Sequence, residues 1–551
     1  MTTPVDTVPV VVVGSGVAGA LVAWRLATAG IRVLVLEAGP SIDRETAVET
    51  FRAAPAKVPE SPYPSTEHAP RPSVLDIGVP GTGYFVQAGP EPFGSTYERI
   101  LGGTTWHWLG SCPRMVPSDF AMRSTFGVGV DWPLSYDELE PSYVEAEQAM
   151  GVAGDSRRDF GSPRSAGYPM EVVPPSFLDS VVGRASTSLG HPLEATPQAR
   201  NTETYNDRPR CDGNSSCIPI CPIGAKYDAL VHLELAREAG AEIRPDSVAV
   251  DLPLRVDGTV AGVRYRRPDG SDVTVLARAV VLAANAVETP KLLLMSNGGN
   301  GVANGSDQVG RNLMDHPIQL SWALAREQVF PHRGPLSTSA IETTKDGPVR
   351  AQRSSFRVEV GNDGWRFPIG DPTVEFTSSP DRPTFVRLRE GGTALARRWF
   401  EHASREIRFA SLTEQLPDPD NRVTPAFDQP DGIGVPRPRI AFRVGSYSRA
   451  GMAAARELHE QLFEALGATE RNHSDIAFGA GHLMGTIRMG TDPATSVVDR
   501  DGRAHDAANL FVVGSSVFPT VGTANPTLTL AALALRTAGA LERALGSLPA
   551  P

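Results

Sequence analysis

Three glycines near the start of the chain have the spacing of a turn that can hold a phosphate group. They follow the apolar run Val10 to Val13 in the pattern Gly14-x-Gly16-x-x-Gly19. In such a turn the first glycine bends the chain, the second lets the backbone approach a pyrophosphate, and the third lets a helix pack closely on the strand. Amide groups at the start of that helix would bind the phosphates. The pattern therefore predicts a dinucleotide-binding site.

A strand, a helix and a second strand must surround the turn for it to bind a dinucleotide. Residues 10–13 predict the first strand, the apolar spacing over 20–27 predicts the helix, and residues 31–36 predict a second strand that ends in Glu37. An acid at this place can accept hydrogen bonds from the ribose hydroxyls of an adenosine. The order of elements supports dinucleotide binding, but it does not choose between FAD and NAD.

A cluster of three cysteines is a second group with possible chemistry. Cys211, Cys217 and Cys221 lie close together and are followed by Pro222, and the chain has only four cysteines. Cysteine runs that end in Cys-Pro occur in iron-sulfur proteins. The other interpretations are a loop of reduced thiols or one local disulfide. Zinc is disfavoured because no histidine follows at zinc-finger spacing. We expect no metal here, with an iron-sulfur cluster as the alternative.

Length, composition and charge exclude several classes of function. The 551 residues allow several domains, and 41% hydrophobic with 21% charged residues is ordinary globular usage. A net charge of −11 disfavours a nucleic-acid-binding surface, which needs a basic patch. The sequence has no apolar run of about 18 residues that would predict a membrane-spanning helix. Its first residues lack the basic and cleavage regions of a signal peptide, so we expect a cytoplasmic location.

Two further segments carry residues suited to a flavin site. Gly102-Gly103-Thr104-Thr105-Trp106-His107-Trp108 is a glycine loop with hydroxyls and an imidazole. Near the end of the chain, a buried-type strand closes with Gly514 and Ser515, and Asn525-Pro526-Thr527 follows. Asparagine is a good helix N-cap and proline suits the first helical position, so we expect a helix from residue 526 to about 545.

With these motifs the chain resembles the glucose-methanol-choline (GMC) oxidoreductases, and within them the pyranose oxidases and bacterial glycoside 3-oxidases. The similarity also covers residues 283–290, 309–317, 414–423 and 482–490. It implies that the dinucleotide is FAD. The cofactor contacts that it implies are Gly14, Gly16, Ala18, Gly19, Glu37, Gly102, Gly103, Thr104, His107, Val248, Ala284, Gly514, Ser515, Asn525, Pro526 and Thr527.

The fold implied by the resemblance is an α/β (α+β) two-domain protein. A Rossmann-type FAD-binding domain would be built from the discontinuous segments 1–155, 225–320 and 476–551, and an antiparallel-sheet substrate domain from 321–475. Residues 156–224 would form a loop-rich connecting segment that carries the cysteine cluster, and residues 163–209 are expected to be loops because they are rich in Pro, Ser and Thr. Specificity loops are expected between about Ser337 and Phe385.

The resemblance also implies a catalytic pair. Oxidation of an alcohol needs a hydride acceptor, which the flavin supplies, and a base for the hydroxyl proton. A neutral imidazole suits that task, and His482 matches the family's catalytic histidine. Asn525 matches the partner position, where pyranose oxidases carry asparagine, and could donate its amide hydrogen to the substrate oxygen. His316 matches no catalytic position and is expected to support a turn before Pro317.

His107 aligns with the histidine through which fungal pyranose oxidases attach FAD covalently. Related sugar dehydrogenases carry a His-Trp pair here without such a bond, and Trp106 departs from the fungal pattern. Covalent and non-covalent FAD therefore both remain open.

These features together predict an FAD-dependent enzyme that oxidises a secondary hydroxyl of a pyranose sugar or glycoside, at C2 or C3, to a ketone. The hydride would pass to flavin N5, with O2 as the electron acceptor giving H2O2. The alternative is a sugar or alcohol dehydrogenase that passes electrons to a quinone or cytochrome, with an iron-sulfur cluster on the cysteines as relay. A flavin-binding protein without turnover is disfavoured because His482 and Asn525 are both present. The oligomeric state stays open.

Overall fold

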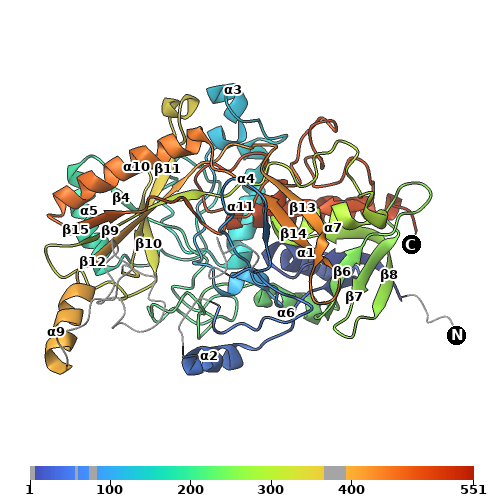
Figure 1. Ribbon diagram of the computed structural model, residues 1–551, viewed down its shortest axis with the longest axis horizontal. Helices are drawn as coiled ribbons and strands as arrows, with labels where there is room; N and C mark the ends of the chain where they lie inside the picture. Colours follow the sequence, from blue (N-terminus) through green and yellow to red (C-terminus); the bar gives the residue numbers. More distant parts are fainter. Residues whose placement is uncertain (1–5, 56–59, 74–82, 365–391, 551) are drawn as a thin grey trace.

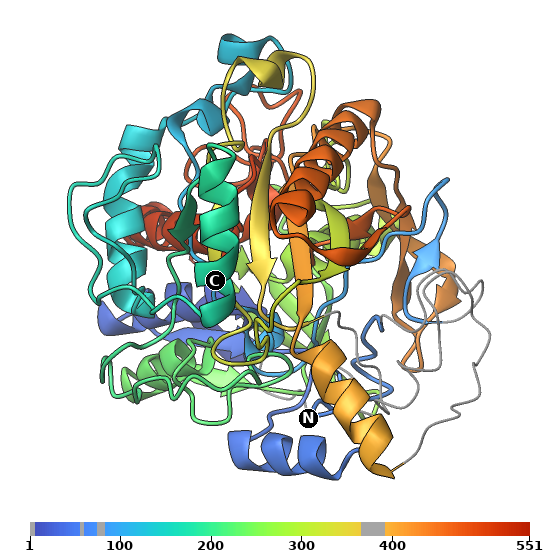
Figure 2. The same cartoon turned by 90° about the vertical axis from the view of Figure 1, so that its left-hand side faces the viewer.

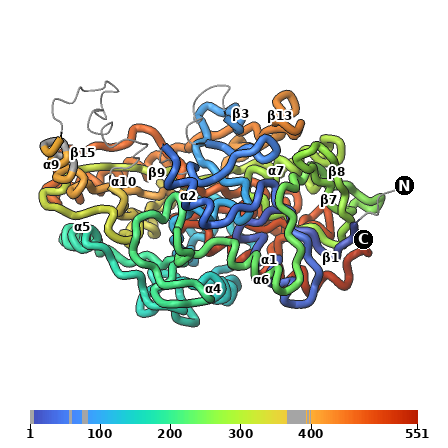
Figure 3. Tube along the Cα trace, turned by 90° about the horizontal axis from the view of Figure 1, so that it is seen from below, coloured from blue at the N-terminus to red at the C-terminus, as the bar shows by residue number. Residues whose placement is uncertain are grey.

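The computed structural model describes residues 6–55, 60–73, 83–364 and 392–550. Within them, two large β-sheets lie toward opposite ends of the long axis of the molecule (Figure 1). The sheet that contains β1 (Asp6–Val13) lies at the end where the first and last described residues are found. Figure 3 shows the same arrangement from below. The second sheet occupies the other end.

The first sheet has the topology of a dinucleotide-binding domain. Its strands in spatial order are β5 (Glu242–Arg244), β2 (Val33–Leu36), β1, β8 (Asp272–Leu282), β7 (Gly262–Arg266) and β6 (Val248–Asp251), with β17 (Leu510–Val512) beside β8. β1 pairs in parallel with β2 and β8. β7 pairs antiparallel with both β8 and β6. Val10 to Val13 are buried, as expected of a parallel strand covered on both faces. The pairing of Val13 with Leu36 places Gly14 and Glu37 at the same edge.

Helices pack against this sheet and between the two ends. α1 contacts α6 and α11, and α11 also contacts α4. The described helices are α1 (Val17–Thr28), α2 (Arg44–Ala53), α3 (Met122–Phe126), α4 (Tyr136–Met150), α5 (Phe177–Ser188), α6 (Leu230–Glu238), α7 (Asn285–Met295), α9 (Gly392–Ala403), α10 (Ser446–Ala465) and α11 (Thr527–Ala544). Short 3-10 turns lie at Gly103–Trp106, Pro117–Phe120, Asn297–Gly299, Pro348–Ala351, Ser515–Val517 and Leu545–Ser547.

The second sheet is antiparallel throughout. Its strands in spatial order are β15 (Thr469–His473), β9 (Pro317–Leu324), β12 (Glu406–Thr413), β11 (Phe356–Gly361), β10 (Ser337–Ile341) and β4 (Leu193–Ala195), with β16 (Phe478–Gly479) beside β9. α10 packs on β9 and β12 through a buried stripe at Ala455, Leu458 and Leu462, spaced as one face of a helix. Figure 2 views this end, with α5 and α10 in front of the strands.

A third, three-stranded sheet supports the first. It consists of β13 (Arg422–Pro430), β14 (Pro436–Ala441) and β3 (Val86–Gln87), and α7 packs against β13 and β14. No helix in the described part of the chain is both long and apolar enough to cross a membrane.

The predicted architecture is confirmed: a Rossmann-type sheet assembled from distant segments, and a separate antiparallel sheet. The predicted domain boundaries stay a prediction. Three strands of the second sheet come from outside the range 321–475, since β4 lies in the connecting segment, β9 begins at Pro317 and β16 begins at Phe478. Of the predicted specificity loops between Ser337 and Phe385, residues 365–391 lie outside the described residues.

The prediction that residues 163–209 are loops is wrong for α5 and β4. Ser176 begins α5 with a capping box: its hydroxyl accepts a hydrogen bond from the Asp179 backbone, and the Asp179 carboxylate accepts one from the Ser176 backbone. This Ser-x-x-Asp signal was present in the sequence, because an acid three residues after a serine stabilises a helix start. The loop prediction instead followed the high content of Pro and Ser in the surrounding residues.

Candidate functional site

The glycine turn after β1 has the shape that the sequence predicts. Gly14 has φ +100°, which strains any residue with a side chain. A Cβ atom on Gly19 would lie 2.0 Å from the Gly14 carbonyl oxygen, so only glycine lets α1 pack this closely. A Cβ on Gly16 would meet nothing within 4 Å. The open space beside Gly16, at the start of α1, therefore fits a pyrophosphate.

Glu37 at the end of β2 closes one side of this turn. Its buried carboxylate accepts hydrogen bonds from the Ser15 backbone (3.1 Å), the Ser15 hydroxyl (2.6 Å) and the Gly39 backbone (3.1 Å). Burial raises the pKa of this carboxyl, and the hydrogen bonds from Ser15 and Gly39 oppose the rise. Glu37 thus fixes the turn, and its contact with a ribose stays a prediction.

The glycine loop at residues 102–104 lies directly against the turn. The Gly102 backbone donates to the Ser15 hydroxyl (3.0 Å), and a Cβ on Gly103 would lie 3.5 Å from the Gly16 Cα. Both glycines have positive φ, +90° and +56°. Thr104 follows them and accepts a hydrogen bond from the Glu98 backbone (3.2 Å). The two predicted cofactor motifs therefore meet in the fold.

The remaining predicted cofactor residues surround the same edge of the first sheet. Ala284, just after β8, approaches Gly14, and Gly514, just after β17, faces Ala18 on α1. Val248 begins β6 next to Ser247, whose backbone donates to the Glu37 carbonyl (2.8 Å). Ser515 lies in a 3-10 turn, and Pro526 and Thr527 begin α11. Ligands of open α/β sheets bind at this carboxyl edge.

His107 presents a buried ring nitrogen in this region. Its Nε2 atom has no hydrogen-bond partner within the described residues, and the ring packs against that of Tyr63. Burial, with smaller contributions from Lys226 and Arg71, lowers the pKa of His107 to about 3, so the imidazole is neutral. An unpartnered neutral imidazole nitrogen fits contact with a flavin. Covalent attachment stays a prediction, and the release of free flavin on acid denaturation would exclude it.

His482 lies at the centre of the predicted catalytic site and contacts a second histidine. Its Nδ1 atom is 2.7 Å from the Nδ1 atom of His316, and the two rings are nearly perpendicular. The other nitrogen of His316, Nε2, lies 3.1 Å from the Gly522 carbonyl oxygen. The expectation that His316 supports a turn stays a prediction, and its side chain in addition links His482 to the segment that precedes Asn525.

Burial also keeps both imidazoles neutral. It lowers the pKa of His482 well below its usual value, and the neighbouring His316 lowers it further. Burial lowers the pKa of His316 to about 4. His482 is therefore unprotonated at neutral pH, which is the form that a general base requires.

Asp315 holds the backbones of both histidines. Its Oδ1 atom accepts hydrogen bonds from the backbone of His316 (2.7 Å), Ala480 (3.1 Å) and His482 (3.1 Å), and its Oδ2 atom accepts one from the Ser95 hydroxyl. Burial raises the pKa of Asp315 to about 6. The Asp-His-Pro motif was visible in the sequence, but nothing in it indicated that His482 would lie beside it.

Asn525 is not the N-cap that its sequence predicts. α11 begins at Thr527 with Pro526 in the cap position and no side-chain cap, while the Asn525 Oδ1 atom accepts a hydrogen bond from Arg357 Nη1 (3.1 Å). An arginine only donates, so the Asn525 oxygen faces Arg357 and its NH2 group is left to donate elsewhere. A long-range charged partner has replaced the local cap.

Arg357, on β11, is a site residue that sequence reasoning missed. It is buried and also bonds Glu342 (2.6 Å), Glu359 (2.5 Å) and the Thr196 hydroxyl (2.6 Å). Two carboxylates therefore hold its guanidinium in place. Nothing in the sequence marks this arginine, because its partners come from β11, from the residue that follows β10 and from two distant loops.

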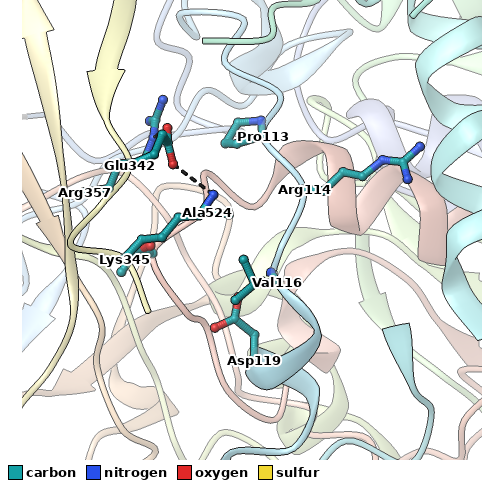
Figure 4. A pocket seen from close by; sticks show the side chains of 9 residues that line it. Pro113, Arg114, Val116, Asp119, Glu342, Lys345, Arg357 and Ala524 are labelled. Carbon is teal, nitrogen blue, oxygen red and sulfur yellow. Dashed lines mark hydrogen bonds and ion pairs between the residues drawn. The ribbon is translucent and has the colours of Figure 1, made fainter. Parts of the chain in front are cut away.

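A small pocket lies beside this arginine. Arg114, Asp119, Glu342, Lys345 and Arg357 contribute most of its polar lining, and Ala524 contributes from the segment before α11 (Figure 4). Figure 4 shows the ion pair between Glu342 and Lys345 at its edge (3.0 Å). The cavity measures about 10 Å³, room for about one water molecule, and its charged side chains are already paired, so it does not outline a substrate.

The three clustered cysteines gather around a buried arginine. All four cysteines of the chain are free, so the alternative of a local disulfide is wrong. Arg200 is buried, and its guanidinium interacts with the sulfurs of Cys211, Cys217 and Cys221. The pKa of Cys217 is lowered: burial opposes the shift, but the charges of Arg200 and Lys226 outweigh it. Among the described residues, no group of three or more His, Cys, Asp or Glu side chains is arranged to hold a single metal ion.

Comparison with known proteins gives matches over almost the whole chain. Two models described as GMC oxidoreductase match residues 98–318 and 417–534, and a model described as FAD dependent oxidoreductase matches residues 9–54. The chain is 36% identical to the fructose dehydrogenase large subunit of Gluconobacter japonicus, covering 97% of each chain. It is 30% identical to paromamine 6'-oxidase of Streptomyces fradiae, covering 97% of this chain and 91% of that one.

A solved structure shows the same fold. The crystal structure of pyridoxine 4-oxidase from Mesorbium loti superimposes with a TM-score of 0.66 at 21% identity, covering 97% of this chain and 99% of that one. The family matches, together with a glycine turn that leaves room for a pyrophosphate, identify FAD as the cofactor. The chain belongs to the GMC oxidoreductase family, as an FAD-dependent enzyme that acts on CH–OH groups.

Proposed function

We propose that this chain oxidises a secondary hydroxyl of a pyranose sugar or glycoside to a ketone. The observation that carries the proposal is that the neutral His482 is linked through His316 to Gly522, in the segment that leads to the oriented amide of Asn525. The hydroxyl proton would pass to His482 while the carbon loses a hydride, which FAD accepts when bound. The Asn525 NH2 group would donate to the substrate oxygen and stabilise the negative charge that develops there.

A sugar substrate is supported by the comparison with known proteins, since one relative is named for fructose and another for paromamine. C2 and C3 of the pyranose ring are the proposed positions of oxidation.

The test of substrate class is anaerobic reduction of the bound flavin. The purified protein is mixed with a panel of free sugars, glycosides and simple alcohols, and the flavin absorbance near 450 nm, in the usual range for an oxidised flavin, is followed. We expect bleaching by sugars or glycosides and a ketone in the product. Bleaching by simple alcohols alone would contradict the sugar proposal.

A second proposal concerns the molecule that reoxidises the reduced flavin. The sequence favours O2, whereas the similarity to a dehydrogenase large subunit and the cysteine cluster favour a quinone or cytochrome. Among the described residues, Cys211, Cys217 and Cys221 are not arranged to hold a single metal ion, so the proposal of an iron-sulfur cluster on them rests on their spacing in the sequence. Such a cluster supplies one-electron transfer. We propose the dehydrogenase, with O2 reduction as the alternative.

Two measurements test this choice. Admission of air to the reduced enzyme should reoxidise the flavin slowly compared with a quinone, and purified protein should contain iron that is lost in Cys217→Ser. Cys112→Ser is the matched control, since Cys112 is also buried and does not interact with Arg200. Rapid reoxidation by air together with iron at background would show an oxidase instead.

A further inference from the structure

His316 is a buried titratable residue that the proposed reaction does not use, although both of its ring nitrogens make hydrogen bonds. Nδ1 lies 2.7 Å from His482 Nδ1, and Nε2 lies 3.1 Å from the Gly522 carbonyl oxygen. Its side chain is fully shielded from solvent. His482 therefore contacts Nδ1, Gly522 contacts Nε2, and the Val521 backbone also hydrogen-bonds the ring.

The identity of these partners decides where the proton on His316 sits. A carbonyl oxygen only accepts hydrogen bonds, so Nε2 of His316 must carry a hydrogen and donate it to Gly522. A neutral imidazole has one N–H, which leaves Nδ1 of His316 as an acceptor. Burial lowers the pKa of His316 to about 4, so the ring is neutral at physiological pH.

The tautomer of His482 follows from that of His316. Because Nδ1 of His316 accepts, Nδ1 of His482 must donate, and the lone pair of neutral His482 then lies on Nε2. We propose that His316 is a positioning residue that fixes His482 in the tautomer whose Nε2 accepts the proton of the substrate hydroxyl. This rests on the proposed function, in which His482 is the base.

The arrangement also suits the charged state that follows proton transfer. The substrate O–H bond breaks and an Nε2–H bond forms on His482, which becomes an imidazolium. Its Nδ1–H still points at the lone pair of His316, so the hydrogen bond persists and stabilises the cation. No proton needs to move between the two histidines.

The pair is held in place before substrate arrives. The Asp315 carboxylate accepts the backbone N–H of both histidines, and β9 begins at Pro317, directly after His316. The charged and titratable groups that act on the pair are Asp315 and Arg357. The local fold therefore fixes the distance between the rings.

Two substitutions separate the two hydrogen bonds of His316. Asparagine carries its side-chain oxygen near the place of histidine Nδ1, so His316→Asn keeps an acceptor for His482. Glutamine carries its amide nitrogen near the place of Nε2, so His316→Gln keeps a donor for Gly522 and loses the acceptor. A residue that only fills space would tolerate both changes equally.

The experiment measures anaerobic flavin reduction by the best sugar in protein that retains FAD. We expect His316→Gln to slow reduction at least about tenfold, and His316→Asn to stay within about threefold of the wild type, since a misplaced base loses most of its catalytic contribution. In a His482→Ala background, His316→Gln should have no further effect, because it acts through His482.

The outcomes distinguish this inference from the proposed function. If His482→Ala reduces the flavin as fast as the wild type, the proposed base is wrong. If His482→Ala is slow but His316→Gln and His316→Asn both match the wild type, or both are slowed alike with FAD retained, the tautomer assignment is wrong. A further decrease in the rate of flavin reduction when His316→Gln is added to His482→Ala would also contradict the tautomer assignment.

Discussion

At the scale of single residues, the proposed site combines one proton acceptor, His482, with one hydrogen-bond donor, Asn525, and a buried residue contacts each of them. His482 is held by His316, and Asn525 is held by Arg357. An alcohol that loses its proton needs this combination, because the proton requires an acceptor and the oxygen left behind requires a donor. The chemistry therefore depends on two residues that need not touch substrate.

The role of Arg357 gives the first residue-scale prediction. Lysine keeps the charge but cannot reach Glu342, Glu359 and Asn525 together, so Arg357→Lys should release Asn525. A hydrogen bond to a charged group contributes about 1.5–3 kcal/mol, so kcat should fall about 10- to 100-fold with FAD retained.

Steady-state kinetics check this prediction, with Arg408→Lys as the control. Arg408 lies on the neighbouring strand β12 and pairs with Asp363 instead of Asn525. Equal losses in the two variants would show that Arg357 only supports the sheet.

The depressed pKa of His482 gives the second prediction. The active form of a base is unprotonated, and burial keeps His482 in that form well below pH 6.5. The rate of flavin reduction should therefore stay constant as the pH falls from 8 to 6, and decline only in more acidic solution. Stopped-flow reduction across this range provides the measurement. A decline with a midpoint at or above pH 6.5 would contradict the assignment.

Single residues also mark the limit of prediction from the sequence. The turn at Gly14, Gly16 and Gly19 could be predicted because it is a local motif, whereas the roles of His482 and Asn525 come from the family resemblance and stay predictions. Arg357 and the contact between His316 and His482 could not be predicted, since they arise from strands that meet only in the folded chain. The predicted cap at Asn525 failed for the same reason.

At the scale of elements, two glycines in the turn between β1 and α1 have different roles. Gly19 is needed for packing, because a Cβ there would lie 2.0 Å from the Gly14 carbonyl oxygen, whereas Gly16 only leaves space open. Gly16→Ala should therefore fold with a near-normal melting temperature but bind FAD much more weakly. Gly19→Ala should lose several kcal/mol of folding stability, since overpacking against a rigid backbone is costly.

Thermal unfolding and flavin content distinguish the two variants. A Gly16→Ala protein that keeps full flavin occupancy would show that the pyrophosphate does not occupy the open space beside this glycine.

Elements with a strong local pattern could be predicted, and those that depend on pairing could not. β1, α1 and β2 follow from an apolar run, a helical spacing and a second apolar run. β4 and β16 are too short to carry a pattern, and they become strands only because β10 and β9 offer paired edges. Propensity alone cannot identify such edge strands.

At the scale of the whole molecule, the proposed catalysis depends on two sheets that lie at opposite ends of the molecule. The first sheet positions the cofactor edge, and the second supplies Arg357 on β11 and His316 just before β9. Asn525 and His482 lie on segments between them. The family resemblance predicted this division, whereas composition alone indicated only a large globular protein.

The central claim is that this fold carries an alcohol-oxidising site with His482 as its base. The most direct test compares anaerobic flavin reduction by a sugar in the wild type and in His482→Ala, both with FAD bound. The account predicts rapid bleaching in the wild type and a rate lower by a factor of about 100 to 10,000 in the variant, the usual contribution of a general base. Equal rates in the two proteins, at equal flavin content, would contradict it.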